Sequence, residues 1–96
     1  MRSKSILIYY KKNDLDHSRL GISASKKFGN AIKRNLFKRI IRETFRLNEV
    51  KNSSFDILVV SNNRFSAQKD IITEIQKKRI ANDSKALFEQ IWANKI

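Results

Sequence analysis

The chain has 96 residues, the length of one small domain, and a formal net charge of +12. It contains no cysteine, which excludes a disulfide framework, a zinc knuckle and a thiol nucleophile. No apolar run reaches the ~20 residues that a membrane-spanning helix needs, and Met1–Tyr10 lacks the features of a signal peptide. We therefore expect one cytoplasmic domain, residues 1–96, with a polyanionic partner. Nucleic acid, an anionic membrane surface and an acidic protein would each fit the charge.

The first 25 residues contain two predicted strands. Ser5–Lys11 is rich in residues that favour strands, and Leu20–Ser25 alternates apolar with small or polar residues at a period of two. The polar segment Lys12–Ser18 between them is typical of a loop. We expect the two strands to pair as a β-hairpin.

The clearest pattern is a helix from about Ala31 to Leu47. Asn30 is a suitable N-cap, because its side-chain oxygen can accept a free backbone N–H. Apolar residues recur at three- and four-residue steps and form one stripe. The stripe comprises Ile32, Leu36, Phe37, Ile40, Ile41, Thr44 and Phe45. The basic side carries Arg34, Lys38 and Arg42 at four-residue steps, with Asn35, Arg39 and Arg46 alongside.

The remaining chain predicts one strand and two helices. Phe55–Val60 is typical of a buried strand of the same sheet. Ser66 is the predicted cap of a helix to about Arg79, and Asp83 that of a helix from Ser84 to about Asn94. Their predicted buried residues are Ile71, Ile72 and Ile75 in the first, and Leu87, Phe88, Ile91 and Trp92 in the second. This order predicts the α+β class: a small sandwich of one sheet with helices packed on it, the basic helix following a β-hairpin.

Charge is concentrated in residues 26–46, which hold eight Lys and Arg residues against one acid, Glu43. A solvated helix face usually mixes Glu with Lys, and like charges four residues apart destabilise a helix slightly. A phosphate backbone instead needs cations at fixed spacing, and Arg can bind phosphate in a bidentate way. The clustering therefore favours nucleic acid over the other polyanions.

The segment Ser25–Asn30 leads into the basic helix. The helix N-terminus offers free N–H groups and the positive end of the helix dipole, and Lys26 and Lys27 lie beside it. This is a candidate phosphate site, and an ordinary strand-to-helix loop with two surface lysines is the alternative.

The segment SKKFGNAIKRNLFKRIIRETFR resembles the signature of the bacterial ribonuclease P protein subunit. That signature has a Ser-Lys-Lys strand end, a Gly-Asn-Ala turn, and then Arg-Asn-Arg, Lys-Arg and Arg on one helix. The matching residues are Ser25, Lys26, Lys27, Gly29, Asn30, Ala31, Arg34, Asn35, Lys38, Arg39 and Arg42. The preceding strand Arg19–Ser23 also matches, and Phe55–Val60 matches more weakly. The close match covers roughly a third of the chain.

The resemblance implies an RNA-binding subunit of an enzyme whose RNA removes the 5′ leader of precursor tRNA. The implied partners are the ribonuclease P catalytic RNA and precursor tRNA, with neither a membrane nor DNA expected. Mg2+ is expected mainly on the RNA, and no residue of this chain is expected to be catalytic or to bind metal. The expected RNA-binding residues are Lys26, Lys27, Asn30, Lys33, Arg34, Asn35, Lys38, Arg39, Arg42 and Arg46. Those expected near the leader are Tyr9, Arg34 and Asn35.

Tyr9 matches an aromatic residue of the family's leader-binding cleft, and an ordinary strand aromatic is the alternative. The sequence departs from the family at Leu36, where a second Arg is usual, and it starts at about the strand that follows the family's N-terminal helix. A structural RNA-binding protein of ribosomal or assembly type is the competing hypothesis. A DNA-binding helix-turn-helix is disfavoured, because a strand precedes the basic helix.

Overall fold

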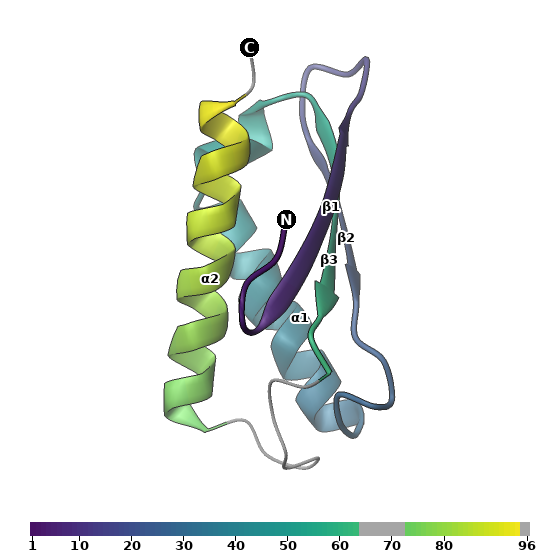
Figure 1. Ribbon diagram of the computed structural model, residues 1–96. Helices are drawn as coiled ribbons and strands as arrows, with labels where there is room; N and C mark the ends of the chain where they lie inside the picture. Colours follow the sequence, from purple (N-terminus) through teal and green to yellow (C-terminus); the bar gives the residue numbers. More distant parts are fainter. Residues whose placement is uncertain (64–72, 95–96) are drawn as a thin grey trace.

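The structure is a computed structural model that describes residues 1–63 and 73–94, and it has the predicted α+β class. One three-stranded sheet is covered on one side by two helices (Figure 1). The strands are β1 (Ile6–Lys12), β2 (Arg19–Ser23) and β3 (Phe55–Ser61). The helices are α1 (Ala31–Arg46) and α2 (Glu74–Ala93), with a short 3₁₀ helix, η1 (Glu49–Asn52), after α1. Neither α1 nor α2, as described, has the length and apolar character to span a bilayer.

The predicted hairpin between the first two strands is wrong. β3 lies between them, antiparallel to β1 and parallel to β2, so that Val59 pairs with both Ile8 and Ile22. β3 is the most apolar strand, and even Leu58 and Val60, which face away from the helices, are apolar. The central position therefore removes the most apolar surface from water. Because β2 and β3 are parallel, they need a crossover connection, and α1 provides it.

The predicted N-cap of α1 is confirmed, since the Asn30 side chain accepts a hydrogen bond from the Lys33 N–H at 2.9 Å. The predicted apolar stripe is confirmed at Phe37 and Ile41, which are buried, and at Leu36, Ile40 and Phe45, which pack against the core. It is wrong at Ile32. Lys33, Phe37 and Ile41 are buried at four-residue steps, whereas Ile32 is 76% exposed. Adjacent residues are rotated by about 100° around a helix. Lys33 rather than Ile32 therefore occupies the buried side in the first turn of α1, whereas Leu36 and Ile40 in the later turns are half buried.

The two predicted C-terminal helices are in fact one, α2. It begins at a capping box in which the Thr73 hydroxyl accepts from the Gln76 N–H while the Gln76 side chain accepts from the Thr73 N–H. Asp83, the predicted cap of a third helix, lies in the middle of α2. The buried residues of α2 recur at three- and four-residue steps: Ile80, Ser84, Leu87, Phe88 and Ile91. The stripe continues through Ser84 because its hydroxyl donates to the Ile80 carbonyl at 2.8 Å.

The predicted cap and the predicted buried residues of the C-terminal helices are confirmed only in part. The predicted cap Ser66 and the predicted apolar residues Ile71 and Ile72 lie outside the described residues. Ile75 is exposed, so its predicted burial is wrong. Leu87, Phe88 and Ile91 are buried as predicted, and Trp92 is partly buried against the core.

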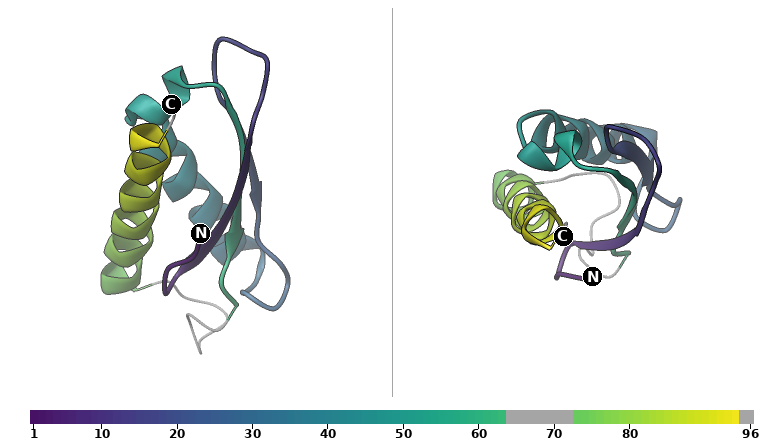
Figure 2. Two further views of the ribbon diagram at one scale, coloured as in Figure 1. Left: turned by 45° about the horizontal axis from the view of Figure 1, so that its top comes forward. Right: turned by 90° about the horizontal axis from the view of Figure 1, so that it is seen from above.

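The core lies between the sheet and the helices. α1 packs along β2 and α2 packs along β1, so that both helices cover the same face (Figure 2). Aromatic rings join the layers: the centroids of Phe28 and Phe37 lie 5.2 Å apart, and those of Phe45 and Phe88 lie 5.7 Å apart. This arrangement leaves β1, β2 and β3 with one face that no described helix covers.

Asp83 joins α2 to the segment before β1. Its carboxylate accepts hydrogen bonds from the hydroxyls of Ser3 and Ser5, at 2.9 and 2.6 Å, and forms an ion pair with Arg79. Burial opposes ionisation, but the hydrogen bonds from Ser5 and Ser3 and the charge of Arg79 together lower the pKa of Asp83. The ionised carboxylate is therefore the form that the folded state prefers.

We predict that Asp83→Ala lowers the free energy of unfolding by about 1–3 kcal/mol, because it leaves the buried Ser5 hydroxyl without its acceptor. The lowered pKa means that the contribution of Asp83 is complete above its ordinary pKa of 3.8 and is lost as the pH falls below it. Urea unfolding of the wild type and Asp83→Asn should therefore differ near neutral pH and converge in acid. Equal stabilities near neutral pH would contradict the prediction.

Candidate nucleic-acid interface

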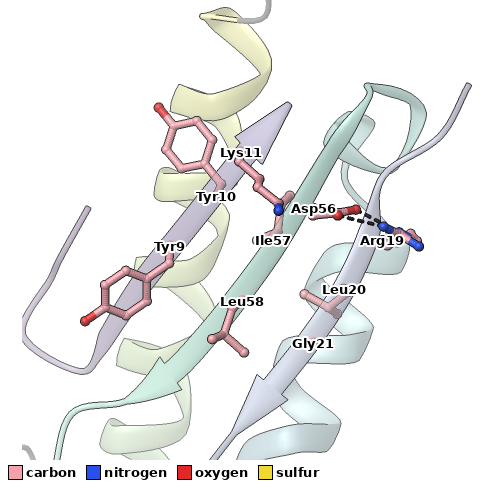
Figure 3. Close-up of a pocket in the computed structure, with 9 residues that line it drawn as sticks. All are labelled: Tyr9, Tyr10, Lys11, Arg19, Leu20, Gly21, Asp56, Ile57 and Leu58. Carbon is pink, nitrogen blue, oxygen red and sulfur yellow. Dashed lines mark hydrogen bonds and ion pairs between the residues drawn. The ribbon is translucent and has the colours of Figure 1, made fainter. Parts of the chain in front are cut away.

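The uncovered face of the sheet carries two rows of side chains that cross the three strands (Figure 3). The strand register pairs Tyr9 with Leu58 and Leu58 with Gly21, which makes one row apolar. It also pairs Lys11 with Asp56 and Asp56 with Arg19, which makes the next row charged. The three strands thus bring an aromatic ring, an aliphatic side chain and two cations onto one surface.

These rows line a groove of about 430 Å³, which we call the open-face groove. Its lining residues are Tyr9, Tyr10, Lys11, Arg19, Leu20, Gly21, Asp56, Ile57 and Leu58. Tyr9 is 60% exposed and Leu58 is 41% exposed, and the strand register places them side by side on this surface. An exposed aromatic ring can stack on a base, and cations beside it can neutralise the phosphate of that nucleotide.

The charged row contains the strongest polar contact of the groove. The Arg19 Nε and Nη2 atoms each donate to a different oxygen of Asp56, both at 2.7 Å, and the Asn13 amide donates to Asp56 at 3.0 Å. The hydrogen bonds from Arg19 and then from Asn13 hold the pKa of Asp56 well below its usual range. Asp56 is therefore an anion at any physiological pH.

α1 presents a second surface, on its solvent side. The exposed or half-exposed members at three- and four-residue steps are Asn35, Lys38, Arg39, Arg42 and Arg46. With the exposed Lys26 and Lys27 of the preceding loop, we call these seven residues the basic surface. Arg46 forms an ion pair with Glu43, whose pKa is lowered by the Arg46 hydrogen bond. Among the described residues, Lys38, Arg39 and Arg42 form no ion pair.

Lys33 does not belong to the basic surface. Its side chain is 1% exposed, and its ammonium lies 4.7 Å from the centre of the Phe28 ring. This placement disagrees with the expectation that Lys33 contacts RNA. Sequence reasoning missed this placement because the apolar Ile32 was expected to lie in the buried stripe. Lys33, four residues before Phe37, takes that place instead.

Phe28 also explains the shape of the loop before α1. The ring is buried against Phe37, and the Phe28 N–H donates to the Ser25 carbonyl at 3.0 Å, closing a turn. Burial of this ring anchors the loop and leaves Lys26 and Lys27, inside the turn, exposed to solvent. Asn30, expected to bind RNA, is exposed with its side-chain oxygen engaged as the helix cap.

Arg34 lies at the margin of the basic surface and is half buried. Its Nε atom is buried and has no hydrogen-bond partner among the described residues. A buried donor without an acceptor costs free energy. An acceptor supplied by a bound molecule would lower that cost.

The residues expected near a leader are not all brought together. Tyr9 lies on the uncovered face of β1, whereas Arg34 and Asn35 belong to α1, which lies behind the sheet in Figure 3. Lys11, Arg19 and Leu58, which the structure places beside Tyr9, were missed by sequence reasoning. The signal was the register across β3, which a hairpin prediction could not provide.

Comparison with known proteins identifies the family. The family model for ribonuclease P matches residues 1–92. The chain belongs to the ribonuclease P protein family. The ribonuclease P protein component of Syntrophus aciditrophicus is 43% identical over 76 residues, covering 76% of this chain and 64% of that protein. The Fusobacterium nucleatum component is 40% identical over 84 residues, covering 86% of this chain and 73% of that protein.

Solved structures of the family have the same fold. The ribonuclease P protein of Thermotoga maritima aligns with a TM-score of 0.77 and 31% identity, covering 95% of this chain and 81% of that one. The Staphylococcus aureus protein aligns with a TM-score of 0.75 and 32% identity, covering 99% and 80%. The chain thus spans less than two thirds of the Syntrophus relative but about four fifths of these two structures.

Two further features bear on the ribonuclease P signature. Leu36, which stands where the family usually has a second Arg, is half buried and packs against the core. It therefore belongs to the apolar side of α1, as predicted.

No three His, Cys, Asp or Glu side chains among the described residues gather as metal ligands. His17 is an exposed loop residue paired with Asp16.

Proposed function

We propose that this chain is the protein component of ribonuclease P and acts on RNA through two surfaces. The basic surface of α1 binds the catalytic RNA, and the open-face groove holds the single-stranded 5′ leader of precursor tRNA. Family membership and the unopposed cations of α1 support the first contact. The competing hypothesis, a structural RNA-binding protein, would use the same helix and would not assist cleavage.

The observation that carries the proposal is the row Lys38, Arg39 and Arg42, which keeps three cations on one side of a helix without acidic partners among the described residues. Helical spacing fixes these cations relative to one another, so a phosphate backbone can meet them without reordering the chain. Each contact releases a counterion from the RNA, so affinity depends steeply on salt. Arg34, at the margin, would gain an acceptor for its guanidinium from a nearby phosphate.

The chemistry of leader removal is assigned to the RNA subunit in this proposal. Mg2+ bound mainly by the RNA would supply the Lewis acid for this hydrolysis and would lower the pKa of an attacking water. The described residues of the chain do not supply a fitting donor set for such an ion. The chain contributes binding and orientation: it neutralises the catalytic RNA and holds the leader. The expected cytoplasmic location follows from this role.

Reconstitution tests the proposal. The chain is mixed with a bacterial ribonuclease P RNA, and precursor tRNA cleavage is followed at low Mg2+, where the RNA alone is nearly inactive. We expect stimulated cleavage at the mature 5′ end, because the cations of the basic surface replace part of the counterion charge. Tight RNA binding without stimulation would instead favour the structural RNA-binding hypothesis. The controls are the RNA alone and the RNA mixed with serum albumin in place of this chain.

A further inference from the structure

The ion pair of the open-face groove leaves part of the Arg19 guanidinium available. A guanidinium has five N–H donors in a planar fork. Asp56 accepts one from Nε and one from Nη2, which leaves the Nη1 donors and the second Nη2 donor for another acceptor. The Arg19 side chain is 62% exposed, whereas that of Asp56 is 27% exposed. The free edge of the fork is therefore accessible while the bound edge is held against the sheet.

The surroundings of Arg19 favour an acceptor on a single nucleic-acid strand. The charged row lies two residues along the strands from the row of Tyr9 and Leu58, a step of roughly 7 Å. A base stacked on the apolar row therefore places a neighbouring phosphate at the charged row. Gly21 keeps this space open, since a Cβ there would lie 3.4 Å from the Leu58 Cδ1 atom and would narrow the groove.

We propose that Arg19 binds a phosphate of single-stranded RNA in the open-face groove and that Asp56 is the positioning residue that orients its guanidinium. This inference rests on the proposed function, in which the groove holds the 5′ leader. Asp56 brings a negative charge into an RNA-binding groove, and it does so directly between Lys11 and Arg19. Asp56 raises the affinity for the leader when the fixed orientation of Arg19 strengthens phosphate binding by more than the negative charge of Asp56 weakens it.

A purely structural role explains the pair less well. Exposed ion pairs add little to stability, because solvent screens them and two side chains must be ordered. The additional hydrogen bond from Asn13 reaches the Asp56 Oδ1 atom, which also accepts from the Arg19 Nε, so Asp56 is held by the loop as well as by Arg19. This amount of ordering is typical of a group that must present a second side chain in one orientation.

The test measures the affinity of reconstituted holoenzyme for precursor tRNAs with no leader, a short leader and a longer leader. The measured quantity is the gain in affinity that the leader provides. We expect Arg19→Ala to reduce this gain roughly 10- to 100-fold and to leave binding of leaderless tRNA unchanged. Lys85→Ala, which removes one positive charge from the exposed side of α2, is the control and should leave the gain intact.

Asp56→Asn separates positioning from charge. It makes the groove more positive, so electrostatics alone predicts tighter leader binding, whereas positioning predicts a gain reduced about 3- to 10-fold. Arg19→Lys keeps the charge without the bidentate fork and should resemble Asp56→Asn. Tighter leader binding by Asp56→Asn would overturn the positioning role. Thermal unfolding of each variant checks that it is folded.

A neutral methylphosphonate placed at each leader linkage in turn provides a readout that does not depend on Asp56. We expect the substitution at one particular linkage to weaken leader binding by the wild type. The same substitution should not weaken binding further in the Arg19→Ala variant. Uniform effects at every linkage, or full additivity with Arg19→Ala, would overturn the assignment of Arg19. If the wild type itself gained no affinity from a leader, the proposed leader site would fail; if the wild type gained and Arg19→Ala kept that gain, only this inference would fail.

Discussion

Replacing Lys38, Arg39 and Arg42 together by Ala is expected to weaken binding of the catalytic RNA roughly 100-fold at physiological salt. The three cations lie on the solvent side of α1 without ion-pair partners among the described residues, so each is available to one phosphate. The loss of three contacts should also reduce the slope of log affinity against log salt by about 2–3. Filter binding or fluorescence titration over a salt series measures both quantities.

The same variant should remain folded. Ala is a better helix former than Lys or Arg, and removal of like charges four residues apart relieves repulsion along α1. A matched variant, Lys78, Arg79 and Lys85 to Ala, removes the same charge from the solvent side of α2 and should keep most of the RNA affinity. Equal losses in the two variants would mean that net charge alone, rather than the basic surface, determines RNA binding.

The sequence predicted local structure better than the order of the strands. The Asn30 cap, the extent of α1 and the α+β class follow from signals within a few residues of one another. The order β1-β3-β2 depends on which strand gains most from the centre of the sheet, and β3 lies more than thirty residues after β2 in the chain. Asp83 resembled a helix cap for the same reason: its partners, Ser3 and Ser5, are distant in sequence.

Of the two surfaces of the candidate site, only the one that depends on local sequence could be predicted. The basic surface could be predicted because helical periodicity sets which residues of α1 share a side. The open-face groove could not, because the row Lys11, Asp56 and Arg19 exists only once β3 separates β1 from β2. Lys33 shows a further limit: a residue type that is almost always exposed became buried because an aromatic ring from the preceding loop accommodates its ammonium.

Phe28→Ala is expected to have the largest effect on stability, about 3–5 kcal/mol, which is a large share of the 5–15 kcal/mol typical of a domain. Phe28 is buried, contacts Phe37 and lies beside the Lys33 ammonium. Truncation therefore opens a cavity and also removes the ring that faces a buried cation. Urea unfolding measures the loss, and Phe28→Leu, which keeps most of the volume, should lose much less.

A double-mutant cycle with Lys33→Met separates the two parts of that loss. If the ring stabilises the ammonium, Phe28→Ala should cost about 0.5–2 kcal/mol less in the Lys33→Met background than in the wild type. Strict additivity would mean that the ring acts only by filling space.

The loop that Phe28 anchors carries Lys26 and Lys27, so Phe28→Ala should also weaken RNA binding. Saturating RNA should restore part of the lost stability by mass action. A structural anchor and an RNA-binding loop are thus coupled through one buried ring.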